Sequence, residues 1–330
     1  MNIKFSYTDP LQLSETLQEY GQAIRITQLE NGEGSYSMAH TKSSCMAIAE
    51  ISASKPLLYE GWGTSWSVDF NWITPMRKAN YPFGYCEGFD MNDNSLGGFN
   101  TFHSNPGDSW GKYSESCSST ACMLDKKTLL NKLQECKASQ AITNLSESIG
   151  LIMDHEAFSQ LRRLARRDLV RGILNPSKYY DLMTICLEEG SHKLHKKKQV
   201  KNQRLLGEIV NLSHDPDEMS TPMSLSDVCQ HLNVGQASLY RTCQDYFGLG
   251  IIEMMTQVRL EEARRSMIYH STASNCDINT IREIAIRFGF KHQGRFSRRY
   301  FTSFGELPSH TLKRSKLVST ASQASPSGED

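Results

Sequence analysis

The sequence predicts an α+β protein: a β-rich N-terminal barrel or sandwich with packed helices, followed by an all-α domain of two helix-turn-helix motifs joined by a longer helix. Three observations lead to this fold class. The first 120 residues contain short β-like segments, the apolar spacing becomes helical from about residue 121, and a repeat occupies the C-terminal third. The length of 330 residues agrees with two domains.

The predicted strands are short segments that alternate polar and apolar residues or mix aromatic with β-branched ones, and turn-forming residues separate them. Such strands at this spacing are typical of a barrel or sandwich. We interpret the aromatic residues of this region as its core, and a ligand pocket lined by them is the alternative. The strands are expected at 22–30, 45–52, 66–73 and 81–89, and the tryptophans are Trp62, Trp66, Trp72 and Trp110.

Helical periodicity starts in the segment 123–136 and recurs in 158–169 and 179–186. These helices are expected to pack on or beside the β unit, and another helix is expected over 200–213. The sequence therefore predicts four parts. They are an N-terminal domain at 1–190, a basic linker at 191–198, a helical domain at 199–316 and a disordered tail at 317–330.

Charge and cysteine usage narrow the class of protein. Lys and Arg together number 36, as do Asp and Glu, so a globally basic coat is excluded. The charge is unevenly distributed along the chain. Residues 1–120 include 7 basic and 13 acidic residues, whereas residues 221–316 include 13 basic and 8 acidic ones. Nine cysteines without a Cys-x-x-Cys pair predict a reducing cytoplasm. Neither a signal peptide nor a membrane-spanning segment is expected.

The repeat has an offset of 57 and each copy reads as two short helices around a tight turn. The run Ser226–Val228 is aligned with Glu283–Ala285, and Gly248 is aligned with Gly305. Both glycines are expected where a second helix stops. In the first copy, either Ser224 or Ser226 is expected to cap the first helix.

The two copies show apolar stripes on their helices, and a longer amphipathic helix is predicted between them. Each pair of helices is therefore expected to bury one face and expose the other. The stripes comprise Leu239, Cys243 and Tyr246 in the first copy, Ile281, Ile284, Ala285, Phe288, Phe296 and Tyr300 in the second, and Met255, Val258, Leu260, Ala263 and Met267 in the connecting helix.

The exposed side of each second helix carries residues suited to reading base edges. A helix-turn-helix exposes this face to the major groove, where Arg and Gln form paired hydrogen bonds with bases. Gly294 lies four residues before Arg298, where a glycine lets the backbone come close. The candidate DNA-contacting residues are Gln236, Ser238, Tyr240, Arg241, His292, Gln293, Arg295, Ser297 and Arg298.

Three segments in order, 225–248, 258–267 and 278–309, resemble the DNA-binding domain of the AraC/XylS family of bacterial transcription regulators. The chain departs from the family pattern at Gly235, where serine is usual, and at Cys243, where an aromatic residue is typical. The resemblance implies an activator that binds duplex DNA without a cofactor. It also implies an N-terminal domain that senses a small-molecule effector or forms a homodimer, and RNA polymerase as a partner.

The N-terminal half, and chiefly the segment 289–296 of the C-terminal domain, are also similar to regulators of ethanolamine utilisation, although this similarity assigns no effector. Two other functions stay open: an enzymatic N-terminal domain tethered to DNA, and an architectural DNA binder without a ligand. His40, His103 and His155 are too far apart in sequence to predict a metal site. Cys117 and Cys122 have no base assigned to them.

A helix expected around 158–170 carries four arginines. We interpret them as a solvated basic face, and anion binding or an intersubunit contact is the alternative. These arginines are Arg162, Arg163, Arg166 and Arg167.

Overall fold

The computed structural model divides the chain into two compact units. The first comprises Met1–Ile26 and Gly34–Arg204, and the second comprises Thr27–Glu33 and Leu205–Asp330. The predicted tail and nearly all of the predicted linker lie outside the described residues, so the four-part division of the chain stays a prediction. The structure describes residues 3–19, 23–62, 67–75, 85–86, 89–90, 98–100, 110–113, 117–147, 156–189, 198–269 and 280–314.

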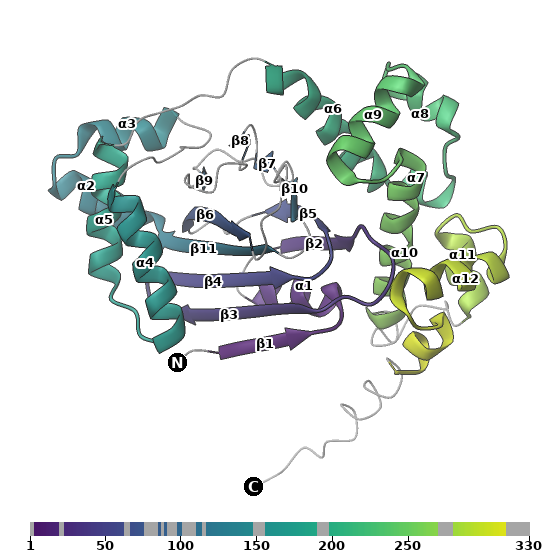
Figure 1. Ribbon diagram of the computed structural model, residues 1–330, viewed down its shortest axis with the longest axis horizontal. Coiled ribbons are helices and arrows are strands. Elements are labelled where there is room, and N and C mark those ends of the chain that lie inside the picture. Colours follow the sequence, from purple (N-terminus) through teal and green to yellow (C-terminus); the bar gives the residue numbers. More distant parts are fainter. Residues whose placement is uncertain are drawn as a thin grey trace, which may run out of the picture. The chain divides into compact units, whose positions relative to one another are not determined.

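The first unit is built on antiparallel sheets (Figure 1). The largest is six-stranded in the order β1-β3-β4-β11-β6-β9, and a second has the order β10-β5-β2. The strands are β1 (Ile3–Tyr7), β2 (Ala23–Gln28), β3 (Tyr36–Lys42), β4 (Met46–Ala53), β5 (Leu57–Trp62), β6 (Ser67–Pro75), β7 (Tyr85–Cys86), β8 (Phe89–Asp90), β9 (Gly98–Asn100), β10 (Trp110–Tyr113) and β11 (Cys117–Asp125).

Of the two predicted architectures, barrel and sandwich, the closed barrel is wrong for the part of this unit that the structure describes. The six-stranded sheet has two free edges, β1 and β9, and its strand order does not close on itself. The side chains of the four tryptophans lie outside the described residues, so their interpretation as core residues stays a prediction. A mixed α and β fold is confirmed, and the β-rich region lies in the N-terminal part as predicted.

Both faces of the central strands are buried, since successive side chains of a strand point to opposite faces. Ile48 on β4 pairs with Cys122 on β11, and both side chains are buried in a cluster with Phe158 and Tyr179. Ala49, one residue further along β4, instead belongs to the cluster that contains Leu13 of the first helix. Helices therefore cover both faces of the sheet.

The helices of the first unit are followed by those of the second, and Figure 1 colours them from purple for the first through teal and green to yellow for the last. They are α1 (Pro10–Glu19), α2 (Lys126–Glu135), α3 (Ser139–Glu147), α4 (Glu156–Arg171), α5 (Pro176–Glu189), α6 (Lys198–Ser213), α7 (Pro216–Ser220), α8 (Leu225–His231), α9 (Gln236–Phe247), α10 (Ile251–Tyr269), α11 (Ile281–Arg287) and α12 (Gln293–Phe304).

The two copies of the repeat form the pairs α8–α9 and α11–α12, but their alignment at a single offset of 57 is wrong. Ser224 and Thr280 begin the first helices with capping boxes to Asp227 and Glu283, which is an offset of 56. The second helices start at Gln236 and Gln293, an offset of 57. The turn of the second copy is therefore one residue longer, and Val228 corresponds to Ile284 rather than to Ala285.

The predicted ends of the second helices are confirmed. Gly248 and Gly305 both cap their helices in the left-handed conformation, each with a φ of 74°. This conformation is strained for residues that have a Cβ atom, so glycine is the expected residue at both ends. The serine that caps α8 is Ser224, which decides between the two serines that the sequence left open.

The connecting helix α10 is longer than its neighbours, as predicted, but its expected amphipathic character is wrong. Apart from Ile252, Glu253 and Tyr269, its side chains are buried or half-buried on every side. Among the buried ones are the charged residues Arg259 and Arg264. Charged side chains buried in this way need partners.

The turn of the second copy packs tightly against the segment that leads into the first. Gly289 has a φ of +75°, and a Cβ atom built on it would lie 2.6 Å from Cγ of Pro222 and 2.9 Å from the backbone oxygen of Met219. Both the backbone conformation and the space therefore require glycine. This contact holds the α11–α12 turn against the chain between α7 and α8.

We expect Gly289→Ala to lower the free energy of unfolding by about 1–3 kcal/mol, because it combines a positive φ with a backbone clash. Thermal unfolding followed by circular dichroism measures the change. Gly250→Ala is the matched control, since a Cβ atom on Gly250 meets nothing within 4 Å. Equal melting temperatures for the two variants would contradict this assignment.

Candidate nucleic-acid interface

The second helix of each pair buries one stripe and exposes the other side. On α9 the buried residues are Leu239, Cys243, Tyr246 and Phe247. On α12 they are Phe296, Tyr300, Ser303 and Phe304. The predicted stripes are therefore confirmed for both helices, and they fix which side of each helix remains available to a ligand.

All four candidate residues of α9 lie on its accessible surface. Gln236, Ser238, Tyr240 and Arg241 are exposed, and Tyr240 is 62% exposed. Ser238 and Arg241 are three residues apart, so they are neighbours on the face opposite Cys243. The structure therefore brings a hydroxyl and a guanidinium together on the outer face of α9. That these groups contact DNA stays a prediction.

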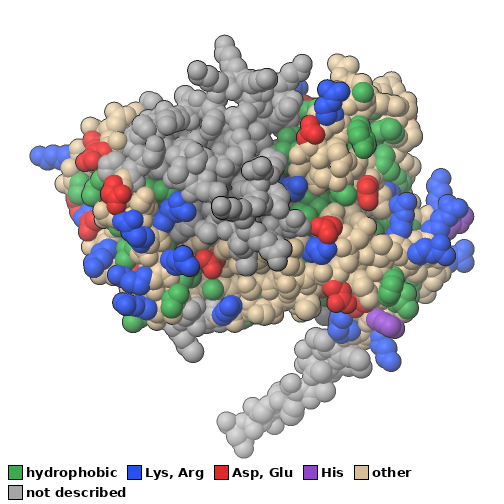
Figure 2. All heavy atoms as spheres, viewed as in Figure 1, with side chains coloured by type: hydrophobic (Ala, Val, Ile, Leu, Met, Phe, Trp, Pro, Cys, Tyr) green, Lys and Arg blue, Asp and Glu red, His purple; other side chains and the backbone are tan. Residues whose placement is uncertain are grey.

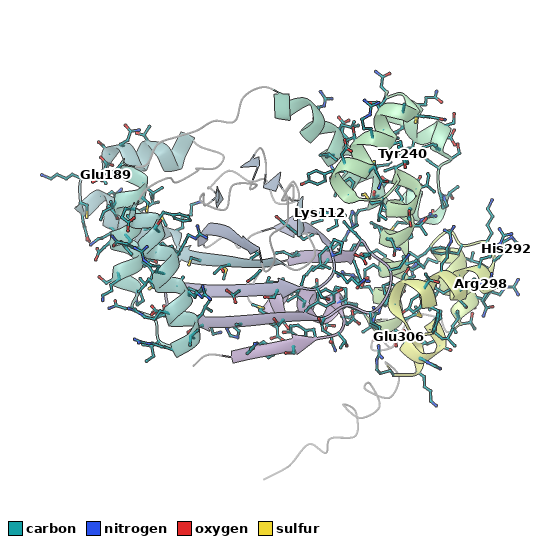
Figure 3. All side chains as sticks on the ribbon, viewed as in Figure 1. Lys112, Glu189, Tyr240, His292, Arg298 and Glu306 are labelled. Atoms are coloured by element: carbon teal, nitrogen blue, oxygen red, sulfur yellow. The ribbon has the colours of Figure 1, made fainter. Side chains whose placement is uncertain are left out.

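Four of the five candidate residues of α12 are exposed. His292, Gln293, Arg295 and Arg298 are exposed and Ser297 is half-buried. Arg295 and Arg298 share the face opposite Tyr300 because they are three residues apart. Within the described residues, the Arg298 side chain forms no ion pair, so its guanidinium is available to a ligand. Figure 3 shows Tyr240 with α9, and His292 and Arg298 with α12.

His292 starts α12 in an extended conformation, but its side chain does not cap the helix. Gly235 likewise starts α9 without a side-chain hydrogen bond. The first backbone N–H groups of α9 and α12 therefore donate to no N-cap side chain, and an anion such as a phosphate is a suitable acceptor for such groups.

The two motifs differ in charge. Residues 280–314 contain eight Lys or Arg and two Asp or Glu, whereas residues 224–248 contain one Arg and two Asp. Figure 2 shows Lys and Arg side chains gathered at the edge that α11 and α12 occupy in Figure 1. The second motif therefore supplies most of the positive charge that a polyanion would meet.

A charged cluster centred on Glu306 fixes the end of α12. The Arg264 side chain of α10 lies 3.2 Å from Oε1 of Glu306, and Arg314 donates to both carboxylate oxygens at 3.0 and 3.1 Å. Thr311 also donates to Glu306 and bonds to the buried Tyr300 hydroxyl. Burial raises the pKa of Glu306, but the bonds from Arg314 and Thr311 and the Arg264 charge outweigh it, so the pKa is lowered.

No sequence pattern indicates this cluster as a unit. Glu306 is adjacent to Gly305 in a turn, and such a position gives no periodic signal. Its partner Arg264 lies 42 residues away, and only the folded chain brings the two together.

The remaining candidates are placed in the first unit. Arg163 pairs with Glu156 and Arg167 with Asp168, both at 2.8 Å, so part of the basic face of α4 is neutralised locally. His40 is buried, and burial lowers its pKa. Cys122 lies in the core. His103 and His155 lie outside the described residues, as does the Cys117 side chain.

In the part of the chain that the structure describes, we find no group of three or more His, Cys, Asp or Glu side chains arranged to hold a metal ion. Within the same residues, every helix is too short or too polar to cross a bilayer.

Comparison with known proteins places the similarity in the second unit. Residues 228–314 match a family model described as a helix-turn-helix domain. XylDLEGF operon transcriptional activator 3 of Pseudomonas putida is 30% identical over 101 residues, 31% of this chain and 29% of that protein. XylDLEGF operon transcriptional activator 2 of the same organism is 30% identical over 101 residues, 31% of this chain and 62% of that protein.

Among solved structures, the C-terminal domain of AraT, a response regulator from Geobacillus stearothermophilus, is 24% identical with a TM-score of 0.28. That likeness covers 34% of this chain and 84% of that one. This chain spans less than two thirds of either curated relative. Its C-terminal part carries a helix-turn-helix domain similar to that of operon activators, which confirms the predicted resemblance there. The similarity to ethanolamine-utilisation regulators stays a prediction.

We expect Glu306→Gln to lower the free energy of unfolding by about 1–3 kcal/mol at neutral pH, because Arg264 loses its buried counter-charge. A lowered pKa in the folded state stabilises the protein above the ordinary glutamate pKa, and this contribution is lost as the pH falls through the lowered value. The variant and the parent should therefore converge in stability at acid pH. Urea unfolding at several pH values measures this, and a constant gap down to the acid limit would contradict it.

Proposed function

We propose that this protein is a sequence-specific transcription regulator that reads duplex DNA with α9 and α12. One observation carries the proposal: two helix-turn-helix pairs bury the apolar stripes of their second helices and leave candidate base-reading side chains exposed. The residues proposed to contact DNA are Gln236, Ser238, Tyr240, Arg241, His292, Gln293, Arg295, Ser297 and Arg298. The two helices would enter successive major-groove faces about one helical turn, or ~34 Å, apart.

The difference in charge supports a division of labour between the motifs. The second motif, with eight basic residues at 280–314, would provide most of the attraction to phosphates. The first motif has little net charge, so Ser238, Tyr240 and Arg241 would act mainly through hydrogen bonds and contacts at base edges. Each chain would then read an asymmetric site without needing a palindrome.

The N-terminal unit would sense a small-molecule effector or form a homodimer. Activation of transcription, through contact with RNA polymerase in the cytoplasm, is the favoured direction, since the names of the relatives describe activators. An enzymatic N-terminal domain and an effector-free architectural role stay as alternative hypotheses. Mapping of genomic binding sites tests the proposal as a whole, because the genes next to those sites would name the regulated pathway.

We expect Arg298→Ala to relax sequence preference and Lys313→Ala to weaken binding to all sequences alike. Arg298 lies on the exposed face of α12, where a lost paired contact to guanine would cost about 1–3 kcal/mol at one base pair. Lys313 lies beyond α12, where its side chain reaches only the DNA backbone. Selection of binding sites from a random library with both variants measures the difference.

If Arg298→Ala leaves the preferred base at every position unchanged, the proposed orientation of α12 is wrong. The melting temperature of Arg298→Ala is the accompanying control. A marked fall in it would assign the arginine a structural role instead.

We expect the affinity for DNA to fall steeply with salt, by about 0.9 log units per neutralised phosphate for each decade of salt concentration. Lys291→Gln, in the second motif, should reduce that slope by about one phosphate. Lys178→Gln, on the exposed surface of α5, is the matched control and should leave it unchanged. Fluorescence anisotropy over a salt series gives the slopes, and a flat response of the parent would refute the electrostatic part of the proposal.

A further inference from the structure

The segment Thr27–Glu33, which we call the strap, belongs to the second unit although its neighbours in the sequence do not. Ile26 before it and Gly34 after it belong to the first unit. The strap comprises the last two residues of β2 and the start of the connection to β3, and it contacts α10 and α12. A short piece of the N-terminal half is thus part of the compact unit that contains both helix-turn-helix pairs.

The strap bonds to backbone groups in the last turn of α12. The Gly32 N–H group donates to the carbonyl oxygens of Thr302, at 3.1 Å, and Ser303, at 3.2 Å. The Gln28 side chain donates to the Ser303 oxygen at 3.4 Å and to the Gly32 oxygen at 2.7 Å. The last four carbonyl groups of a helix lack partners within that helix. The strap therefore supplies α12 with a cap from a distant part of the chain.

One side chain of the strap joins two helices. The Oδ1 atom of Asn31 accepts a hydrogen bond from Nε2 of Gln257 on α10 at 2.8 Å and another from Oγ of Ser303 on α12 at 3.2 Å. Gln257 and Ser303 are 7% and 3% exposed, so donors left without this acceptor would be poorly solvated. Asn31 thus fixes the C-terminal half of α12 against α10.

The strap also lies beside a candidate base-reading residue. Asn31 and Arg298 line the same pocket of about 460 Å³. The Thr302 hydroxyl donates to the Arg298 carbonyl oxygen at 3.0 Å, so the capped turn and Arg298 are one helical turn apart. A cap that orders the last turn of α12 therefore also restrains the backbone at Arg298.

We propose that the groove between α10 and α12 is an interaction surface for the strap, and that the docked strap increases the ability of α12 to read DNA. This proposal rests on the proposed function of α12. Docking orders the recognition helix before it meets DNA, which reduces the loss of conformational entropy on binding. Because the strap continues into β2 and β3, a signal received by the first unit would reach the second motif through it.

The test compares full-length Asn31→Ala with the parent, using the duplex that the parent selects from a random library. We expect Asn31→Ala to weaken binding by about 3- to 10-fold, the effect of losing one or two hydrogen bonds. Base preference should relax only at the positions read by α12. Asn31→Asp keeps an acceptor at Oδ1 and should restore most of the affinity. Gln257→Ala removes one of the same bonds from the α10 side and should shift binding in the same direction.

Three results would overturn the proposal. Unchanged affinity of Asn31→Ala, in a variant that folds, would make the strap irrelevant to DNA binding. Tighter binding would make it inhibitory. An equal loss of preference at the positions read by both motifs, together with a lower melting temperature, would reduce it to a structural element. If the parent itself selects no duplex, the proposed function fails first, and that failure is seen before any variant is compared.

Discussion

The row of aromatic rings along the buried side of α12 is the contact on which the second motif depends. The rings of Phe296 and Tyr300 have centroids 5.7 Å apart, those of Tyr300 and Phe304 are 4.7 Å apart, and Phe290 from the preceding turn lies 5.1 Å from Phe296. These rings share one apolar cluster with Leu260 and Ala263 of α10 and with Ile284 of α11. Because burial of aromatic surface is among the largest favourable terms in folding, this row of rings fixes the rotation of α12 about its own axis.

That rotation determines which side chains remain outside. With Tyr300 in the core, Arg295 and Arg298 must lie on the opposite face. The position of the buried Arg264 charge depends on the same packing of α12. The Arg264 guanidinium lies over the Phe304 ring at 4.5 Å while it pairs with Glu306, so the row of aromatic rings and the ionic cluster share a side chain. A guanidinium stacked on a ring retains its planar hydrogen-bonding edge, which lysine could not reproduce.

The C-terminal fold could be predicted from the sequence because its signals are local. Capping residues, helical stripes and terminal glycines each lie within a few residues of the element they define, and most were placed correctly. The single offset failed because the longer turn at Gly289 shifts the alignment by one residue in a region with no periodicity. The amphipathic interpretation of α10 failed because burial on all sides depends on neighbours that are distant in sequence.

The candidate site was predictable only in part for the same reason. The exposed residues of α9 and α12 follow from helical geometry once the buried stripe is known. The Glu306 cluster and the strap depend on pairs such as Gln257 with Asn31, which are 226 residues apart, and no spacing rule links such residues. In the first unit, the open edges of the sheet could not be told from a closed barrel, because short alternating strands are common to both architectures.

The close contact of Gly289 with Pro222 has a consequence for the kind of DNA site that this protein would tolerate. The turn of one motif rests on the chain that leads into the other, and the second motif shares an apolar cluster with Leu260 and Ala263 of α10. These contacts oppose a change in the distance between α9 and α12. A binding site could vary in the bases within either half and still be used. Inserting one base pair between the halves would rotate one of them by about a tenth of a helical turn, and the packing of the two motifs on each other would oppose the matching movement of one helix pair.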